Sequence, residues 1–525
     1  MVLAERLRRW LLRVSSGQVE AGERDYLPEH GTTEAFLVLA GSADPGVSPS
    51  EFATALLTVA RDGDAAAQGA ALDAVGGVAA RWWLALDESL RQRWWWVPGW
   101  SRGIALDLAE GDLDTLRLVV AGCHHDGRIR EAAVLRLADR QHPAAVAVLA
   151  LRACDWVAEV RQAARTVVAG WPSPPDGESL RMLTELAFAL GVRREGAWLA
   201  QYVEATLRDL PAQRLEPLLS ARDQRVRRAA YRAAIAAGRL GLDRLMRAAV
   251  RESDLPIRTM CARVAVTVAD PVQLRALLAS RTALVRAEAL QALIARGDLA
   301  VAETALTDRH PLVREIAQST LRRGGSDPAD RYRRLATRVP AEPSVIAGLG
   351  ETGGPDDAEL VTRGLAHPRA RGRVEAIRAL RRLGVAQPVA LVPLLHDDSA
   401  AVTRQVVATL RRNAEAVDLD ELRTLLGTTN PSHVRFAGYR LLTGGDAWQR
   451  LATDLELVDD TDERLRVTAR ADLATWLDHE AATTYHGPSR ERTAELDRLI
   501  EQARPVLGDG RARLLRFHAG LATAG

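Results

Sequence analysis

Residues 284–297 read Leu284-Val-Arg-Ala-Glu-Ala-Leu-Gln-Ala-Leu-Ile-Ala-Arg-Gly, and residues 312–324 repeat the pattern as Leu312-Val-Arg-Glu-Ile-Ala-Gln-Ser-Thr-Leu-Arg-Arg-Gly. In both stretches the apolar residues recur at the three- and four-residue spacing of one helix face. Both also end in glycine, a residue that favours the end of a helix. The pair therefore predicts two copies of one helical unit, each carrying the same Val-Arg marker.

The marker arginine recurs through most of the chain. Successive copies are 28 to 34 residues apart, except for one gap of 59 that spans a degenerate unit near Val345. A unit of about 31 residues accommodates two short helices and two loops, and neither helix can bury its apolar stripe unless the units stack on one another. The marker arginines are Arg130, Arg161, Arg193, Arg227, Arg258, Arg286, Arg314, Arg373, Arg404, Arg435 and Arg466.

The spacing and the Asp…Val-Arg…Ala…Leu…Gly pattern resemble HEAT repeats, especially the short bacterial kind found in phycobilisome-lyase-like proteins. The resemblance covers about three-quarters of the chain. It implies an all-α, right-handed superhelix of antiparallel helix pairs, in which each marker arginine reaches the turn of the neighbouring unit and forms a ladder of Asp–Arg contacts. A bilin-lyase role is what that subtype would imply, but nothing in the sequence marks a bilin site.

Three parts of the chain are expected to differ in role. Residues 1–110 form a Trp-rich helical N-terminal segment, for which degenerate repeats are one interpretation. Residues 111–485 form a solenoid of about twelve units, and residues 486–525 form a C-terminal helical cap. Aspartates four positions before a marker arginine are suited to cap the second helix of a unit. They are Asp126, Asp223, Asp254 and Asp462.

Composition supports a helical protein of the cytoplasm. Aromatic residues make up only 4% of the 525 residues, and Ala, Leu, Glu and Arg favour helix over sheet. The three cysteines are too few for a disulfide framework, and no apolar run approaches about 18 residues, the length of a membrane span. All 70 basic residues are arginine, for which codon usage and selection against lysine are alternative explanations. The net charge of +2 is low for a dedicated nucleic-acid binder.

Two stretches resemble chemical motifs, but each has a simpler structural interpretation. Gly348-Leu-Gly-Glu-Thr-Gly353 matches G-x-G-x-x-G, yet a dinucleotide site needs a preceding strand, and these glycines fall where other units end, so helix termination is predicted. Cys123-His124-His125 lacks the second ligand pair that a zinc site requires, so turn and core packing are predicted. We therefore expect no metal, no cofactor and no enzymatic activity.

Half of the 12 tryptophans lie between residues 82 and 100. Three consecutive helical residues fan over about 200°, so Trp94, Trp95 and Trp96 cannot all face one core. Two interpretations stay open: the cluster closes the N-terminal end of the solenoid, or these three tryptophans contact a partner.

Charge is unevenly distributed along the chain. Residues 214–251 contain ten arginines and three acids, residues 363–382 contain seven arginines and one acid, and residues 446–480 are acidic. Arginines four apart share a helix face and suit bidentate recognition of carboxylates or phosphates, although a solvated face with internal ion pairs is the alternative. The predicted partner contacts are Arg225, Arg228, Arg232, Arg371, Arg378 and Arg382.

The expected function is a scaffold or adaptor that holds a protein partner with an acidic surface. Nucleic-acid binding through the phosphate backbone is the alternative, and its affinity would depend steeply on salt. HEAT-like DNA glycosylases make an enzyme conceivable, but the acidic residue and aromatic clamps that they need cannot be placed in this sequence.

Overall fold

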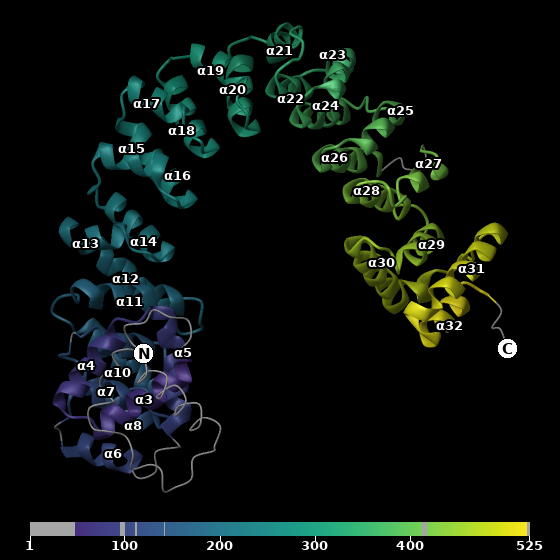
Figure 1. The fold of residues 1–525 in the computed structure, drawn as a ribbon. Coiled ribbons are helices and arrows are strands. Elements are labelled where there is room, and N and C mark those ends of the chain that lie inside the picture. Colours follow the sequence, from purple (N-terminus) through teal and green to yellow (C-terminus); the bar gives the residue numbers. More distant parts are fainter. Residues whose placement is uncertain (1–47, 95–99, 111–112, 141, 412–416, 522–525) are drawn as a thin grey trace, which may run out of the picture. The chain divides into compact units, whose positions relative to one another are not determined.

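The computed structural model describes residues 48–94, 100–110, 113–140, 142–411 and 417–521. Within these ranges every regular element is a helix and none is a strand, so the predicted all-α solenoid of helix pairs is confirmed (Figure 1). The chain divides into two compact units, and the boundary lies between Val268 and Ala269. None of the helices in the described ranges has the length and apolar character needed to span a bilayer.

The first unit is built mainly from consecutive helix pairs. From α7 onward, each first helix packs on the second helix that follows it, as α9 does on α10 and α15 on α16. The helices are α3 (Pro49–Asp62), α4 (Ala65–Gly76), α5 (Ala80–Arg93), α6 (Trp100–Glu110), α7 (Thr115–Ala121), α8 (Gly127–Arg136), α9 (Pro143–Arg152), α10 (Ala158–Ala169), α11 (Gly177–Leu190), α12 (Ala197–Asp209), α13 (Ala212–Leu219), α14 (Gln224–Ala236), α15 (Leu242–Arg251) and α16 (Leu255–Val268).

Helices α3, α4 and α5 form an additional layer on the first helices of this unit. Helix α3 packs on α7, α4 on α7 and α9, and α5 on α9 and α11. Helix α9 therefore has neighbours on opposite sides, and all nine of its residues from Ala144 to Arg152 are buried. This double burial explains the nearly continuous apolar run Pro143-Ala-Ala-Val-Ala-Val-Leu-Ala-Leu, which shows no amphipathic period.

The second unit continues the succession of helix pairs. Its second helices α18, α20, α22, α24, α26 and α28 pack on one another in order, and α31 packs on α29 and α32. The helices are α17 (Pro271–Leu278), α18 (Ala283–Ala295), α19 (Ala300–Ala305), α20 (Pro311–Arg323), α21 (Pro328–Ala336), α22 (Pro343–Thr352), α23 (Ala358–Thr362), α24 (Ala370–Arg382), α25 (Pro388–Leu391), α26 (Ala400–Leu410), α27 (Leu419–Thr424), α28 (Ser432–Leu442), α29 (Ala447–Leu457), α30 (Glu463–Thr475), α31 (Arg490–Leu507) and α32 (Asp509–His518).

The Asp–Arg ladder expected from the resemblance is present in part: Arg130, Arg286, Arg373 and Arg435 pair with an aspartate of the next repeat. Arg161 and Arg227 pair with glutamates instead. Arg286 forms a bidentate ion pair with Asp308 of the next repeat, at 2.6 and 2.7 Å, and donates to the carbonyl oxygen of Ser280 before its own helix. The backbone carbonyl of Asp308 in turn accepts from Arg314. One aspartate thus joins two repeats. The same arrangement recurs at Asp155, between Arg130 and Arg161, and at Asp460, between Arg435 and Arg466.

The four aspartates predicted as helix caps all accept backbone N–H groups at the start of a second helix. Asp126 accepts from Arg128, Asp223 from Arg225 and Val226, Asp254 from Ile257, and Asp462 from Arg464 and Leu465. Each cap therefore fixes where the second helix begins and, four residues later, where the marker arginine stands.

The degenerate repeat differs in both its ion pair and its glycines. Arg314 pairs with Glu351 on α22, because no loop aspartate stands at the usual place. The prediction that all three motif glycines end a helix is wrong for Gly348 and Gly350. Both lie inside α22 and are buried, and only Gly353 caps the helix. A Cβ on Gly350 would lie 2.3 Å from the Cβ of Ala379, so glycine is needed where α22 approaches α24.

Candidate partner-binding cavity

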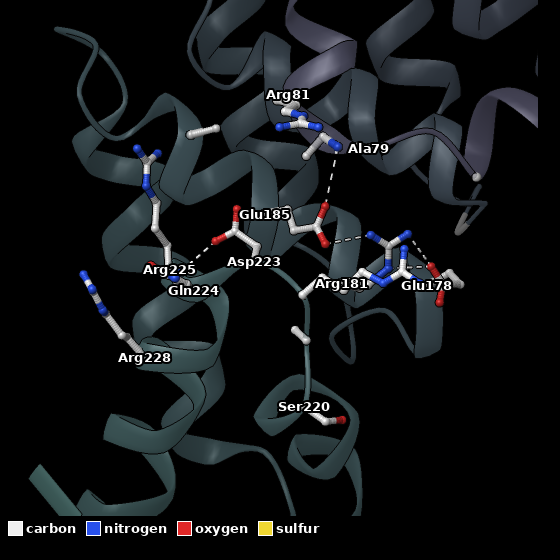
Figure 2. A pocket seen from close by; sticks show the side chains of 15 residues that line it. Ala79, Arg81, Glu178, Arg181, Glu185, Ser220, Asp223, Gln224, Arg225 and Arg228 are labelled. Carbon is white, nitrogen blue, oxygen red and sulfur yellow. Dashed lines mark hydrogen bonds and ion pairs between the residues drawn. The ribbon is translucent and has the colours of Figure 1, made fainter. Parts of the chain in front are cut away.

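A cavity of about 1010 Å³ lies in the first unit where α5 meets α11 and the start of α14 (Figure 2). Helix α5 reaches this place because it packs on α11, and the backbone N–H of Ala80 lies 3.5 Å from the carboxylate of Glu185, 105 residues away. Small residues in α5 and α11, and in the segments before α5 and α14, keep the space open. They are Gly77, Ala79, Ala80, Ala189, Ser220 and Ala221.

The carboxylates of the cavity wall have partners within the protein. Arg181 bonds to Glu178 at 2.6 Å and to Glu185 at 2.7 Å, and Figure 2 shows its guanidinium beside both. Asp223 accepts the N–H groups of Arg225 and Val226 as the cap of α14. Three acids of the wall are thus neutralised or used as a helix cap.

Several arginines of the same wall have no such partner. Among the described residues, Arg81 and Arg222 form no side-chain hydrogen bond or ion pair, and both are exposed. Arg225 donates only to the backbone carbonyl of Phe188, at 3.2 Å. Arg228 differs, because it pairs at 2.8 Å with Asp254, whose side chain is 2% exposed. The wall therefore carries at least three guanidinium groups that no carboxylate of the described chain neutralises.

The remaining predicted arginines lie outside this cavity. Arg232 pairs with Glu204 at 3.0 Å, and Arg371 donates to the carbonyl oxygen of Arg309 at 2.7 Å. Arg378 contacts Glu375, and Arg382 is 3.8 Å from Glu351 in a smaller cavity of the second unit. The six arginines are thus divided between the two units, and only Arg225 and Arg228 share one cavity.

Of the two interpretations of the tryptophan cluster, contact with a partner does not fit Trp94. Its side chain is 1% exposed and stacks on Trp100, with the ring centroids 4.8 Å apart, and it also contacts the ring of His124. It is a core residue and cannot contact a partner in this conformation. Trp95 and Trp96 lie outside the described residues.

Sequence reasoning missed Arg81 and Arg222 as wall residues. Arg222 lies in the basic stretch of residues 214–251, next to the cap Asp223, so the local charge was a usable signal. For Arg81 no local signal exists, because its place in the wall depends on the packing of α5 on α11. Within the described ranges, no group of three or more His, Cys, Asp or Glu residues is arranged to hold a metal ion.

A second cluster of titratable groups is buried near the C-terminal end. Asp454 on α29 is 1% exposed and accepts a hydrogen bond from the hydroxyl of Tyr439 at 2.9 Å. Burial, together with the negative charge of Asp472, raises the pKa of Asp454 to about 8. Asp472 itself pairs with Arg450 at 2.7 Å. Asp454 is therefore a neutral carboxyl at pH 7 that donates or accepts hydrogen bonds inside the core.

We expect the raised pKa of Asp454 to make stability fall with rising pH. Between about pH 4 and pH 8 the folded state holds a proton on Asp454 that the unfolded state releases. In this range the free energy of unfolding therefore falls by about 1.4 kcal/mol for each unit by which the pH rises. Urea unfolding of wild type and Asp454→Asn at pH 6 and pH 8 tests this. The stability of wild type relative to the variant should fall by on the order of 2 kcal/mol between these pH values. An identical pH dependence of the two proteins contradicts the assignment.

No protein-family model matches this chain, and no curated protein sequence matches it. Among solved structures, the chain is similar to importin-β at 14% identity, over 93% of this chain and 74% of that one, with a TM-score of 0.34. It is similar to yeast importin-β (Kap95p) at 14% identity and a TM-score of 0.29, covering 99% of this chain but only 64% of that one. An engineered protein aligns at 18% identity over 77% of this chain and 97% of its own, with a TM-score of 0.26.

Proposed function

We propose that this protein is a non-catalytic scaffold that holds a protein partner through exposed arginines of its second helices. The observation that carries this proposal is that arginines of the same helix differ: some are held in buried ion pairs within the solenoid, and others are exposed. On α24, Arg373 is committed to the ladder through a bidentate pair with Asp397, with its side chain 17% exposed. On the same helix the Arg382 side chain is 43% exposed, and its contact with the Glu351 carboxylate is long, at 3.8 Å.

The exposed arginines are available to a partner at small cost. On α14, Arg232 has a side chain that is 62% exposed and pairs with Glu204, which is 43% exposed. Surface ion pairs of this kind contribute about 0–1 kcal/mol, so a partner's carboxylate can replace the internal one without a large loss. Ladder arginines differ, because breaking a buried pair leaves an uncompensated charge.

A protein partner fits these arginines better than a nucleic acid. The Glu204 carboxylate, which is 43% exposed, lies beside Arg232 and would repel a continuous row of phosphates. A protein surface can place its acids opposite the arginines alone. The whole-chain charge of +2 is also small for a phosphate-binding surface.

Replacement of exposed arginines is expected to release the partner. The surface variant carries Arg232→Glu, Arg371→Glu, Arg378→Glu and Arg382→Glu, and it spares Arg228 because a new acid there would face the buried Asp254. In a pull-down from native lysate with nuclease, analysed by mass spectrometry, wild type should retain a protein that the surface variant loses at least about tenfold.

A matched control separates specific contacts from net charge. The control variant carries Arg208→Glu, Arg247→Glu, Arg251→Glu and Arg338→Glu, all of them exposed residues without an ion pair among the described residues. It should retain the partner. If nuclease removes the bound material, the nucleic-acid alternative replaces this proposal, and if the surface variant retains every partner, the arginines are only a solvated face.

A further inference from the structure

We propose that the cavity between α5, α11 and α14 binds an acidic peptide segment of the partner protein. This inference rests on the proposed scaffold function and adds the location of one contact and the chemistry of its ligand. Its three walls come from the N-terminal layer, from a first helix and from the start of a second helix, so the site exists only when α5 is packed on α11.

The size of the cavity suits a peptide. Its volume of about 1010 Å³ is at the upper end of the usual range for ligand sites, about 300–1,000 Å³. The alanines, glycine and serine of its wall leave this space unfilled. A short extended segment with several side chains can therefore enter.

The charge of the wall selects carboxylates. Arg81 on α5 and Arg225 on α14 lie on different sides of the cavity, and Arg222 precedes α14 (Figure 2). Since their guanidinium groups have no carboxylate partner in the described chain, they can form the planar, bidentate bonds that arginine makes with carboxylates. Two or three acidic side chains in one peptide segment can contact all three guanidinium groups.

The acids of the same wall favour a polypeptide over a phosphate chain. Glu178 is 67% exposed although it is paired with Arg181, so it faces the space that a ligand enters. A nucleic acid has a negative charge at every nucleotide and would be repelled there. A peptide can place a neutral residue at that point and donate a backbone N–H to the Glu178 carboxylate.

The test is direct binding of a defined probe to the full chain. The probe is a fluorescein-labelled peptide of alternating glutamate and glycine, about ten residues long, followed by fluorescence anisotropy. The same peptide with glutamine in place of glutamate and a single-stranded oligonucleotide serve as comparison probes. Wild type should bind the glutamate peptide at least about tenfold more tightly than either comparison probe.

Three variants locate the binding. The cavity variant, Arg81→Glu with Arg222→Glu and Arg225→Glu, should weaken binding of the glutamate peptide at least about tenfold. Ser220→Trp reduces the volume without changing charge and should also weaken it. The matched control, Arg208→Glu with Arg247→Glu and Arg251→Glu, should change it less than about twofold. Should the cavity variant unfold, the triple replacement by glutamine takes its place.

The outcomes separate this inference from the scaffold proposal. Unchanged peptide binding in the cavity variant and in Ser220→Trp overturns the cavity assignment, and so does an equal loss in the control. If the surface variant still loses its cellular partner, the scaffold proposal stands without the cavity. Tighter binding of the oligonucleotide, abolished in the cavity variant, overturns the peptide as the ligand.

Discussion

Replacing Asp155 with alanine is expected to lower the free energy of unfolding of the first unit by about 3–5 kcal/mol. The Asp155 carboxylate forms a bidentate pair with Arg130, at 3.0 and 3.1 Å, and also pairs with Arg152 at 3.0 Å. The three side chains are between 0% and 2% exposed. Without Asp155, two guanidinium groups stay buried, and only that of Arg152 keeps another carboxylate, Asp87.

Urea unfolding followed by circular dichroism measures this effect. Glu204→Ala is the control, because it removes an exposed partner of Arg232 and should cost no more than about 1 kcal/mol. The double variant Arg130→Met/Asp155→Leu should be more stable than Asp155→Ala, since it removes a charge from the core together with its partner. If Asp155→Ala costs no more than Glu204→Ala, the buried ladder does not stabilise the solenoid.

The sequence was a good guide to everything that repeats locally. The phase of the marker arginines placed most second helices, as where Asp223 caps α14 four residues before Arg227. Arg193 is an exception, because it lies in the turn before α12 and not on that helix. The ladder partner was also within reach, since Asp308 stands one repeat after Arg286. These features involve contacts within about one repeat length, which is the distance over which a solenoid determines its own packing.

What the sequence could not predict depends on contacts between distant segments. Nothing near Arg81 indicates that α5 packs on α11, so the cavity was not foreseen. Trp94 was interpreted from its own helix alone, but the rings that contact it belong to Trp100 at the start of α6 and to His124 in the turn before α8. Local periodicity states which residues share a face, and it does not state what covers that face.

The two uses of arginine in this chain follow from one property of the guanidinium group. It remains charged in the core and presents several donors at fixed angles, so it can join a carboxylate and two carbonyls at once, as Arg286 does. The same geometry suits a partner's carboxylate when the side chain is exposed. Position on the helix therefore decides whether an arginine stabilises the array or is free to bind.

The second large effect is expected at the closest approach of two second helices, where Gly350→Ala should lower the free energy of unfolding of the second unit by about 2–3 kcal/mol. A Cβ at this position would lie 2.3 Å from the Cβ and 2.5 Å from the Cα of Ala379. The backbone of α24 cannot yield as a flexible side chain would, so α22 and α24 must separate. The cost exceeds the gain of about 1 kcal/mol that alanine usually brings inside a helix.

Gly69→Ala is the matched control, since Gly69 lies inside α4 and an added Cβ there meets nothing within 4 Å. It should stabilise the first unit by up to about 1 kcal/mol, so the two glycine-to-alanine changes are expected to have opposite signs in the same urea-unfolding measurement. Stabilisation by both would mean that α22 and α24 do not approach as closely as described. Destabilisation by Gly350→Ala alone would show that this glycine serves helix packing, and that the G-x-G-x-x-G match reflects the contact with α24.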